Sequence, residues 1–193
     1  NRRSRGLGDV YKRQPFYYVQ IAPFGGYDSR REQSERVTSA ELRESQVLTL
    51  SQPNVGMAIT TDLGDFKSIH PPKKKEVGER LALWALNKNY NFEDLVYSGP
   101  IYKSVEFIND KILVSFDHAD SGLYCPDKKI KHLEIAGDDN NYFPADSKII
   151  KDKLLVWSKN VLSPKSVRLG WKNYFEINLF NQEGLPASSF RSK

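Results

Sequence analysis

Two short apolar runs near the start of the chain constrain its fold more than any other feature. The runs are Phe16 to Pro23 and Val55 to Thr60. A strand that is apolar along its whole length is typical of a parallel sheet in which both faces are covered. Between the two runs, Thr38 to Glu41 fits a capping box, which predicts a helix from there to about Leu50.

A second helix is expected after the second apolar run. Pro71 and Pro72 stand where the first turn of a helix tolerates proline. The residues that follow supply one apolar helical face, formed by Val77, Leu81, Trp84 and Ala85. The order strand, helix, strand, loop, helix predicts the edge of a doubly wound α/β sheet.

The pattern changes near Tyr97, where short apolar segments separated by turns begin. Six segments are predicted to be strands: Ile101 to Ile108, Lys111 to Phe116, Lys131 to Ala136, Ser147 to Ile150, Leu154 to Ser158 and Ser166 to Trp171. Strands at this spacing are typical of an all-β sandwich. We therefore expect an α/β part over residues 15–96 and a β-sandwich domain over residues 97–193.

The basic character of the chain comes from its first residues. The net charge is +5, and residues 1–14 carry four of these charges. A basic arm normally suggests a nucleic acid or an anionic surface as partner. However, Ser4 to Gln14 matches the in-frame translation of a transposase-type sequencing adapter, whose mosaic end encodes Asp9 to Gln14. We therefore treat residues 1–14 as an adapter-like artefact, expected to be disordered, and do not expect nucleic-acid binding. Natural sequence is expected to begin near Pro15, within a truncated reading frame.

Composition excludes several other classes of protein. The hydrophobic fraction of 39% and the charged fraction of 27% are ordinary for a globular protein. No apolar run approaches the ~20 residues that a membrane span needs, and no segment resembles a signal peptide. The single cysteine, Cys125, excludes an internal disulfide and a cysteine-based zinc site.

The segment from Thr61 to Pro71 carries the candidate chemistry. It follows an apolar strand directly and contains Asp62, Asp65 and His70. Histidine titrates nearest neutral pH, and a carboxylate can orient its ring and stabilise its cation. Aspartates are also common in turns, so turn formation is an alternative role. A metal site built from the same three side chains is a further alternative.

Four stretches of the sequence resemble the sialate O-acetylesterase family, a branch of the SGNH-type serine hydrolases. They are PFYYVQIAPF at 15–24, LRESQ at 42–46 with PNVGMAITTDLGD at 53–65, IHPPKKKEVGERLALW at 69–84, and the VRLGW and NLFNQEGLPASSFR segments at 167–171 and 178–191. The resemblance implies a carbohydrate esterase that needs no cofactor and no metal. It also implies a secreted or periplasmic protein whose substrate is an O-acetylated sugar or oligosaccharide.

The resemblance further implies site residues. His70 takes the place of the family's catalytic base. Many SGNH enzymes carry an aspartate three residues before this histidine, where the present chain has Lys67. Asp65 is the preferred partner because it is closer in sequence, Asp62 is the second candidate, and a backbone carbonyl is a third possibility.

The chain lacks a recognisable nucleophile. It contains no Gly-Asp-Ser, no Gly-x-Ser-x-Gly and no Gln-Gly-Glu block. The serine and its oxyanion donors are therefore expected upstream of Pro15, and the chain alone is expected to be inactive. Two alternatives stay open: an esterase acting on xylan or another polysaccharide, and a non-catalytic carbohydrate-binding sandwich with a vestigial α/β part.

Overall fold

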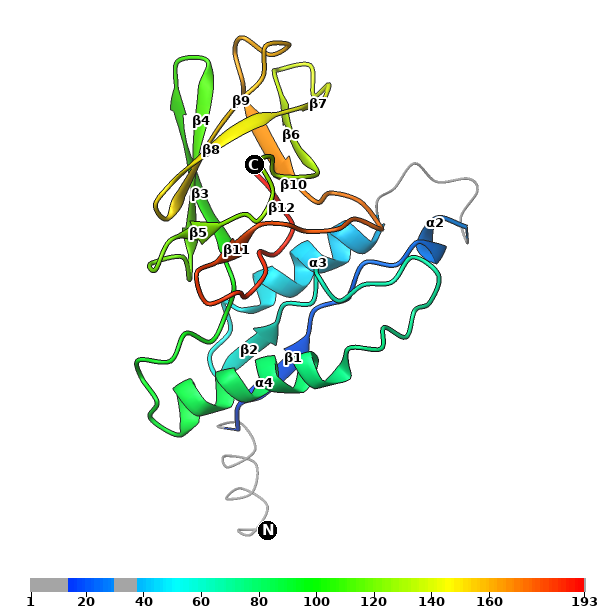
Figure 1. Cartoon of the computed structure of the whole chain (residues 1–193), viewed down its shortest axis with the longest axis vertical. Helices are drawn as coiled ribbons and strands as arrows, with labels where there is room; N and C mark the ends of the chain where they lie inside the picture. Colours follow the sequence, from blue (N-terminus) through cyan, green and yellow to red (C-terminus); the bar gives the residue numbers. More distant parts are fainter. Residues whose placement is uncertain (1–13, 30–37, 193) are drawn as a thin grey trace, which may run out of the picture.

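The structure is a computed structural model that describes residues 14–29 and 38–192 (Figure 1). The expected disorder of residues 1–14 concerns residues that lie, apart from Gln14, outside this description. Within the described ranges, no helix is both long enough and apolar enough to cross a membrane. The described chain is mostly β-structure with few helices.

The N-terminal part contains one parallel pair of strands and the helices around it. Strands β1 (Phe16–Val19) and β2 (Val55–Ala58) pair in parallel. Helix α3 (Thr38–Thr49) and helix α4 (Lys74–Asn89) both pack against β2, and a short helix α2 (Gly26–Ser29) follows β1. The predicted order of strand, helix, strand, loop and helix is confirmed.

Two details of this part differ from the prediction. Strand β1 is not buried on both faces, since Phe16 is 63% exposed and Val19 is 39% exposed. Within the described residues its only strand neighbour is β2, which is itself largely buried. The prolines Pro71 and Pro72 precede α4 rather than forming its first turn, because the helix begins at Lys74.

The C-terminal part contains two four-stranded antiparallel sheets. One has the order β3-β4-β9-β8, formed by Ile101–Ile108, Lys111–Asp117, Lys153–Trp157 and Asp146–Ile150. The other has the order β12-β10-β6-β7, formed by Phe190–Arg191, Ser166–Leu169, Leu133–Ala136 and Phe143–Pro144. A small antiparallel pair joins β5 (Leu123–Tyr124) to β11 (Phe180–Asn181). All six predicted strands are present.

One apolar core lies between these two sheets. Ile112, Val114 and Phe116 alternate along β4 and are buried, and Ile135 of β6 and Val167 of β10 belong to the same cluster. Alternation at a period of two is what a strand with one covered face requires. The hairpin between β3 and β4 turns at Asn109, whose φ of 54° is a left-handed conformation that asparagine tolerates.

Polar contacts join the two parts of the chain at the buried face of α3. Asn173 Oδ1 accepts hydrogen bonds from the amide of Ser39 at 3.1 Å and from its hydroxyl at 2.5 Å, so Asn173 caps the helix from the other part. The side chain of Thr38, which the capping-box prediction needs, lies outside the described residues. Arg43 is fully buried and donates to Ser189 Oγ at 2.9 Å and to the carbonyl of Lys172. Burial lowers the pKa of Arg43 to about 10.

Candidate active site

The three predicted site residues lie on one loop, residues 61–73, which joins β2 to α4 and is called the site loop here. The loop leaves the carboxyl end of β2 and is fastened to the segment that follows β1. The amide of Asp65 donates to the carbonyl of Pro23 at 3.2 Å, and Phe24 and Asp65 form a parallel bridge. A side chain at Gly64 would place its Cβ 2.3 Å from the same carbonyl oxygen, so this approach requires glycine.

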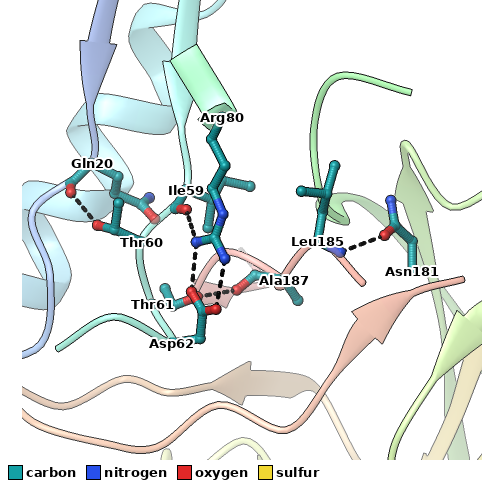
Figure 2. A network of polar contacts seen from close by, with 9 residues as sticks. All are labelled: Gln20, Ile59, Thr60, Thr61, Asp62, Arg80, Asn181, Leu185 and Ala187. Carbon is teal, nitrogen blue, oxygen red and sulfur yellow. Dashed lines mark hydrogen bonds and ion pairs between the residues drawn. The ribbon is translucent and has the colours of Figure 1, made fainter. Parts of the chain in front are cut away.

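Asp62 is engaged by an arginine from α4. The two guanidinium nitrogens of Arg80 donate to Asp62 Oδ1 at 2.6 Å and to Oδ2 at 2.7 Å (Figure 2). This is a bidentate pair in which both carboxylate oxygens have a donor. The ion pair is partly buried, since the side chains of Arg80 and Asp62 are 11% and 19% exposed.

Asp65 shapes the loop around its own carboxylate. Its Oδ1 accepts the amides of Lys67 at 2.7 Å and Ser68 at 3.0 Å. This is the local side-chain to backbone pattern that aspartate makes in turns. The turn chemistry weighed for Asp65 on sequence grounds is therefore present in the structure.

His70 is exposed, and its imidazole has no hydrogen-bond partner among the described residues. Only its backbone is engaged, because the amide of His70 donates to Ser68 Oγ at 3.1 Å. The structure therefore brings His70, Asp65 and Asp62 onto one loop but does not join the imidazole to either carboxylate. The catalytic roles of all three residues stay predictions. No group of three or more His, Cys, Asp or Glu in the described ranges is arranged to hold a metal ion.

An aromatic pair lies on the surface of the site loop. Phe66 is 61% exposed, and its ring meets that of Tyr174 edge to face with a centroid separation of 5.2 Å. Tyr174 belongs to the C-terminal part of the chain, so residues of both parts meet here. Trp171 and Phe175, the other aromatic residues of this region, are buried and serve packing.

The remaining histidines pack against aromatic rings. The ring of His118 lies 4.8 Å from that of Tyr97, and the ring of His132 lies 6.1 Å from that of Phe175. Burial lowers the pKa of both histidines. His118 and His132 are thus half-buried residues that pack against aromatic rings, and both lie outside the site loop.

Sequence reasoning missed Arg80, which is the best-connected charged side chain at the site loop. Its burial was unexpected because arginine on a helix is normally solvated. A signal was available: Arg80 lies four residues before Trp84 and three after Val77, so it falls within the predicted apolar face of α4. A charge in an apolar helical stripe requires a buried partner.

Comparison with known proteins identifies relatives in both sequence and structure. No family model matches the chain. The mouse sialate O-acetylesterase is 28% identical over 131 residues, which are 63% of this chain and 24% of that protein. The human sialate O-acetylesterase is 28% identical over 124 residues, 61% of this chain and 21% of that protein. The rat protein is 37% identical over 71 residues, 34% of this chain and 13% of that protein.

A solved structure matches most of the chain. It is a carbohydrate acetylesterase from Xanthomonas citri, with a TM-score of 0.85 and 38% sequence identity over 93% of this chain and 41% of that chain. The chain thus spans less than half the length of the bacterial enzyme and about a quarter or less of the mammalian proteins. The curated relatives are sialate O-acetylesterases and the structural neighbour is a carbohydrate acetylesterase, so these matches support the resemblance of this chain to the sialate O-acetylesterase family.

Proposed function

We propose that this chain supplies the general base of a carbohydrate O-acetylesterase, and that His70 is this base. In the proposed reaction a serine hydroxyl attacks the acetyl carbonyl while His70 takes the hydroxyl proton. His70 then returns the proton to the sugar oxygen as the C–O bond breaks, and it activates the water that hydrolyses the acetyl-serine. The observation that carries the proposal is an exposed imidazole on a loop after a parallel strand, in a chain 38% identical to a carbohydrate acetylesterase.

We further propose that Asp65 orients His70. Both oxygens of Asp62 already receive hydrogen bonds from Arg80, so Asp62 would have to give up this partly buried ion pair to orient His70. Asp65 uses only Oδ1 for the amides of Lys67 and Ser68 in the described structure, which leaves Oδ2 for the imidazole. Because Lys67 occupies the position where many SGNH enzymes carry the aspartate, this pairing departs from the usual spacing.

The nucleophile is proposed to lie in a longer protein that contains this chain. Two observations support this: the chain matches 41% of the bacterial acetylesterase, and it contains no Gly-Asp-Ser or Gly-x-Ser-x-Gly motif. In this proposal β1 and β2, with the helices α3 and α4 packed on them, form the last part of an SGNH-type α/β domain. Residues 97–193 form an accessory β-sandwich. The longer protein is proposed to be secreted or periplasmic, as the family resemblance implies.

The aromatic pair of Phe66 and Tyr174 supports a sugar as the substrate. The Phe66 ring is exposed and the Tyr174 ring is half-buried, and an exposed aromatic ring offers a flat apolar surface against which the C–H face of a pyranose can pack. Phe66 lies four residues before His70 on the site loop, so a sugar bound there would lie beside the proposed base.

The test compares the present chain with the longer protein. The chain alone should not hydrolyse p-nitrophenyl acetate, because it lacks the nucleophile. In the longer protein, His70→Ala should lower kcat by several orders of magnitude, by analogy with dissected serine triads. O-acetylated sialic acid and acetylated xylo-oligosaccharides, offered separately, distinguish the two proposed substrate classes.

Two results would contradict the proposal. The first is hydrolysis of the aryl acetate by the chain alone at an enzymatic rate, with His70→Ala without effect. The second is a longer protein that binds the oligosaccharides but hydrolyses none of them, which would favour a binding module.

A further inference from the structure

Arg80 connects three elements at the start of the site loop. It lies on α4 and, besides the bidentate pair with Asp62, it donates from Nη1 to the carbonyl of Ile59 at 2.7 Å, directly after β2 (Figure 2). Arg80 is only 9% exposed, so these bonds replace the water that the guanidinium would otherwise bind. One side chain therefore holds the end of β2, the start of the site loop and the helix that follows the loop.

A second set of bonds reaches the same place from the far end of the chain. Thr61 Oγ1 donates to the carbonyl of Ala187 at 2.8 Å, and Gln20 Nε2 donates to Ser188 Oγ at 2.8 Å. Thr60 Oγ1 completes the set by donating to the carbonyl of Gln20 at 2.6 Å. All of these side chains are buried. Residues 185–191, called the tail segment here, thus contact the carboxyl ends of both parallel strands.

Few contacts hold the end of the site loop that carries His70. Beyond Asp62, the contacts of the loop are the buried side chain of Leu63, the hydrogen bond from the Asp65 amide to the Pro23 carbonyl, the Asp65 turn and the ring contact of Phe66 with Tyr174, whereas the imidazole of His70 is exposed. The direction in which the loop leaves β2 therefore depends on residues 59–62, which hydrogen-bond to Arg80 and to the tail segment.

We propose that Arg80 and Thr61 are positioning residues for His70. Arg80 acts through Asp62 and Ile59, and the tail segment acts through Thr61. The role rests on the proposed function, because a loop needs to be positioned only if its histidine reacts. In this proposal the role of Asp62 is to accept the two hydrogen bonds from Arg80. A lysine cannot reproduce the arrangement fully, because it lacks the planar fork that engages both carboxylate oxygens.

The first test measures amide hydrogen exchange by NMR in the full 193-residue chain. Arg80→Met should speed exchange of the Leu63, Asp65 and Ser68 amides at least about 10-fold, while the amides of β4 and β9 change less than about two-fold. Arg80→Lys should recover part of the protection. Thr61→Val, which removes the hydroxyl without changing side-chain shape, should speed exchange of the same loop amides at least about three-fold.

The matched control is Lys75→Met on the same helix. Lys75 is exposed and pairs only with Glu79 at 3.5 Å, so its loss should leave loop exchange unchanged. If Arg80→Met fails to fold, Asp62→Asn provides the same test, because it removes the charge at nearly constant shape. Loop amides that exchange as in the original chain would overturn the proposal. So would loop and β4 amides that accelerate equally, since that would indicate loss of global stability only.

The second test uses kinetics in a longer protein with acetylesterase activity. Arg80→Met should lower kcat at least about 10-fold with little change in KM for p-nitrophenyl acetate, and Arg80→Lys should recover part of kcat. An unchanged kcat would overturn the positioning role. The exchange measurement needs no activity, so it can fail while His70→Ala still abolishes hydrolysis. Conversely, a fully active His70→Ala protein would refute the proposed function and leave the exchange result standing.

Discussion

Replacing Gly64 with alanine should destabilise the chain, whereas the same replacement at Gly78 should stabilise it. At Gly64 a new Cβ would lie 2.3 Å from the Pro23 carbonyl oxygen and 3.0 Å from its carbon. These are backbone atoms, so no side-chain rotation relieves the contact. The site loop would have to move by about 1 Å to reach an ordinary separation, which lengthens the hydrogen bond from Asp65 to Pro23.

The size of the effect follows from these two losses. Overpacking against fixed neighbours costs about 1 to 3 kcal/mol. Leaving a buried carbonyl without its donor costs about 1 to 3 kcal/mol more, so the free energy of unfolding should fall by about 2 to 6 kcal/mol. Gly78 lies inside α4 with nothing within 4 Å of the added Cβ. There alanine should raise the free energy of unfolding by about 0.5 to 1 kcal/mol.

The assay is urea unfolding followed by tryptophan fluorescence. Both variants add one methyl group, so Gly78→Ala is the control for the added group at a position where it meets no neighbour, and only Gly64→Ala adds the contact with Pro23. Gly64→Ala should lower the urea midpoint by at least about 1 M with an unchanged slope. A Gly64→Ala protein within about 0.5 kcal/mol of the original would refute the reasoning, since that is the range of a surface substitution. The close approach would then not fasten the site loop.

Three further outcomes are expected. Burial lowers the pKa of His118, with a smaller lowering by Lys88 and opposing contributions from Asp117 and Asp120. Below pH 6.5 the unfolded chain therefore binds more protons than the folded chain, so the free energy of unfolding should fall as the pH falls. His118→Gln should reduce the change in urea midpoint between about pH 7.5 and about pH 5.5. A pH dependence of the midpoint equal to that of the original chain would contradict this. In a longer active protein, Tyr174→Ala should raise KM for an acetylated xylo-oligosaccharide about 2- to 10-fold more than KM for an aryl acetate, and an equal rise for both would argue against a sugar contact. Burial also raises the pKa of the Cys125 thiol, so it should react with a disulfide reagent more slowly in the folded chain than in urea, and equal rates would exclude a protected thiol.

The strands of the C-terminal part could be predicted because their pattern is local. Ile112, Val114 and Phe116 alternate with exposed or half-exposed residues. This period of two indicates a strand with one covered face, whichever strands or sheets cover it. The burial of β1 could not be predicted in the same way. The sequence of an apolar strand is the same whether one or two strands pair with it. The number of paired strands depends on the rest of the sheet.

The candidate site was predictable in its residues but not in their contacts. Asp62, Asp65 and His70 stand out because they cluster after a strand. However, the partner of Asp62 comes from α4, 18 residues later. A sequence pattern shows which side chains can accept a proton or a hydrogen bond, but tertiary packing decides which donor reaches them. For the same reason the cap of α3 at Ser39 comes from Asn173, 134 residues away.

The tail segment has a consequence for how the protein is made. Its bonds to Thr61, Arg43 and Gln20 join residues that are 126, 146 and 168 positions apart. At typical rates of synthesis the N-terminal strands would wait roughly 6 to 34 seconds for these partners to be translated. During that interval the ends of β1 and β2 keep open hydrogen-bonding groups and apolar surface, which is the state in which nascent chains associate wrongly. The N-terminal part should therefore need protection by chaperones on the ribosome until residues 187–189 emerge.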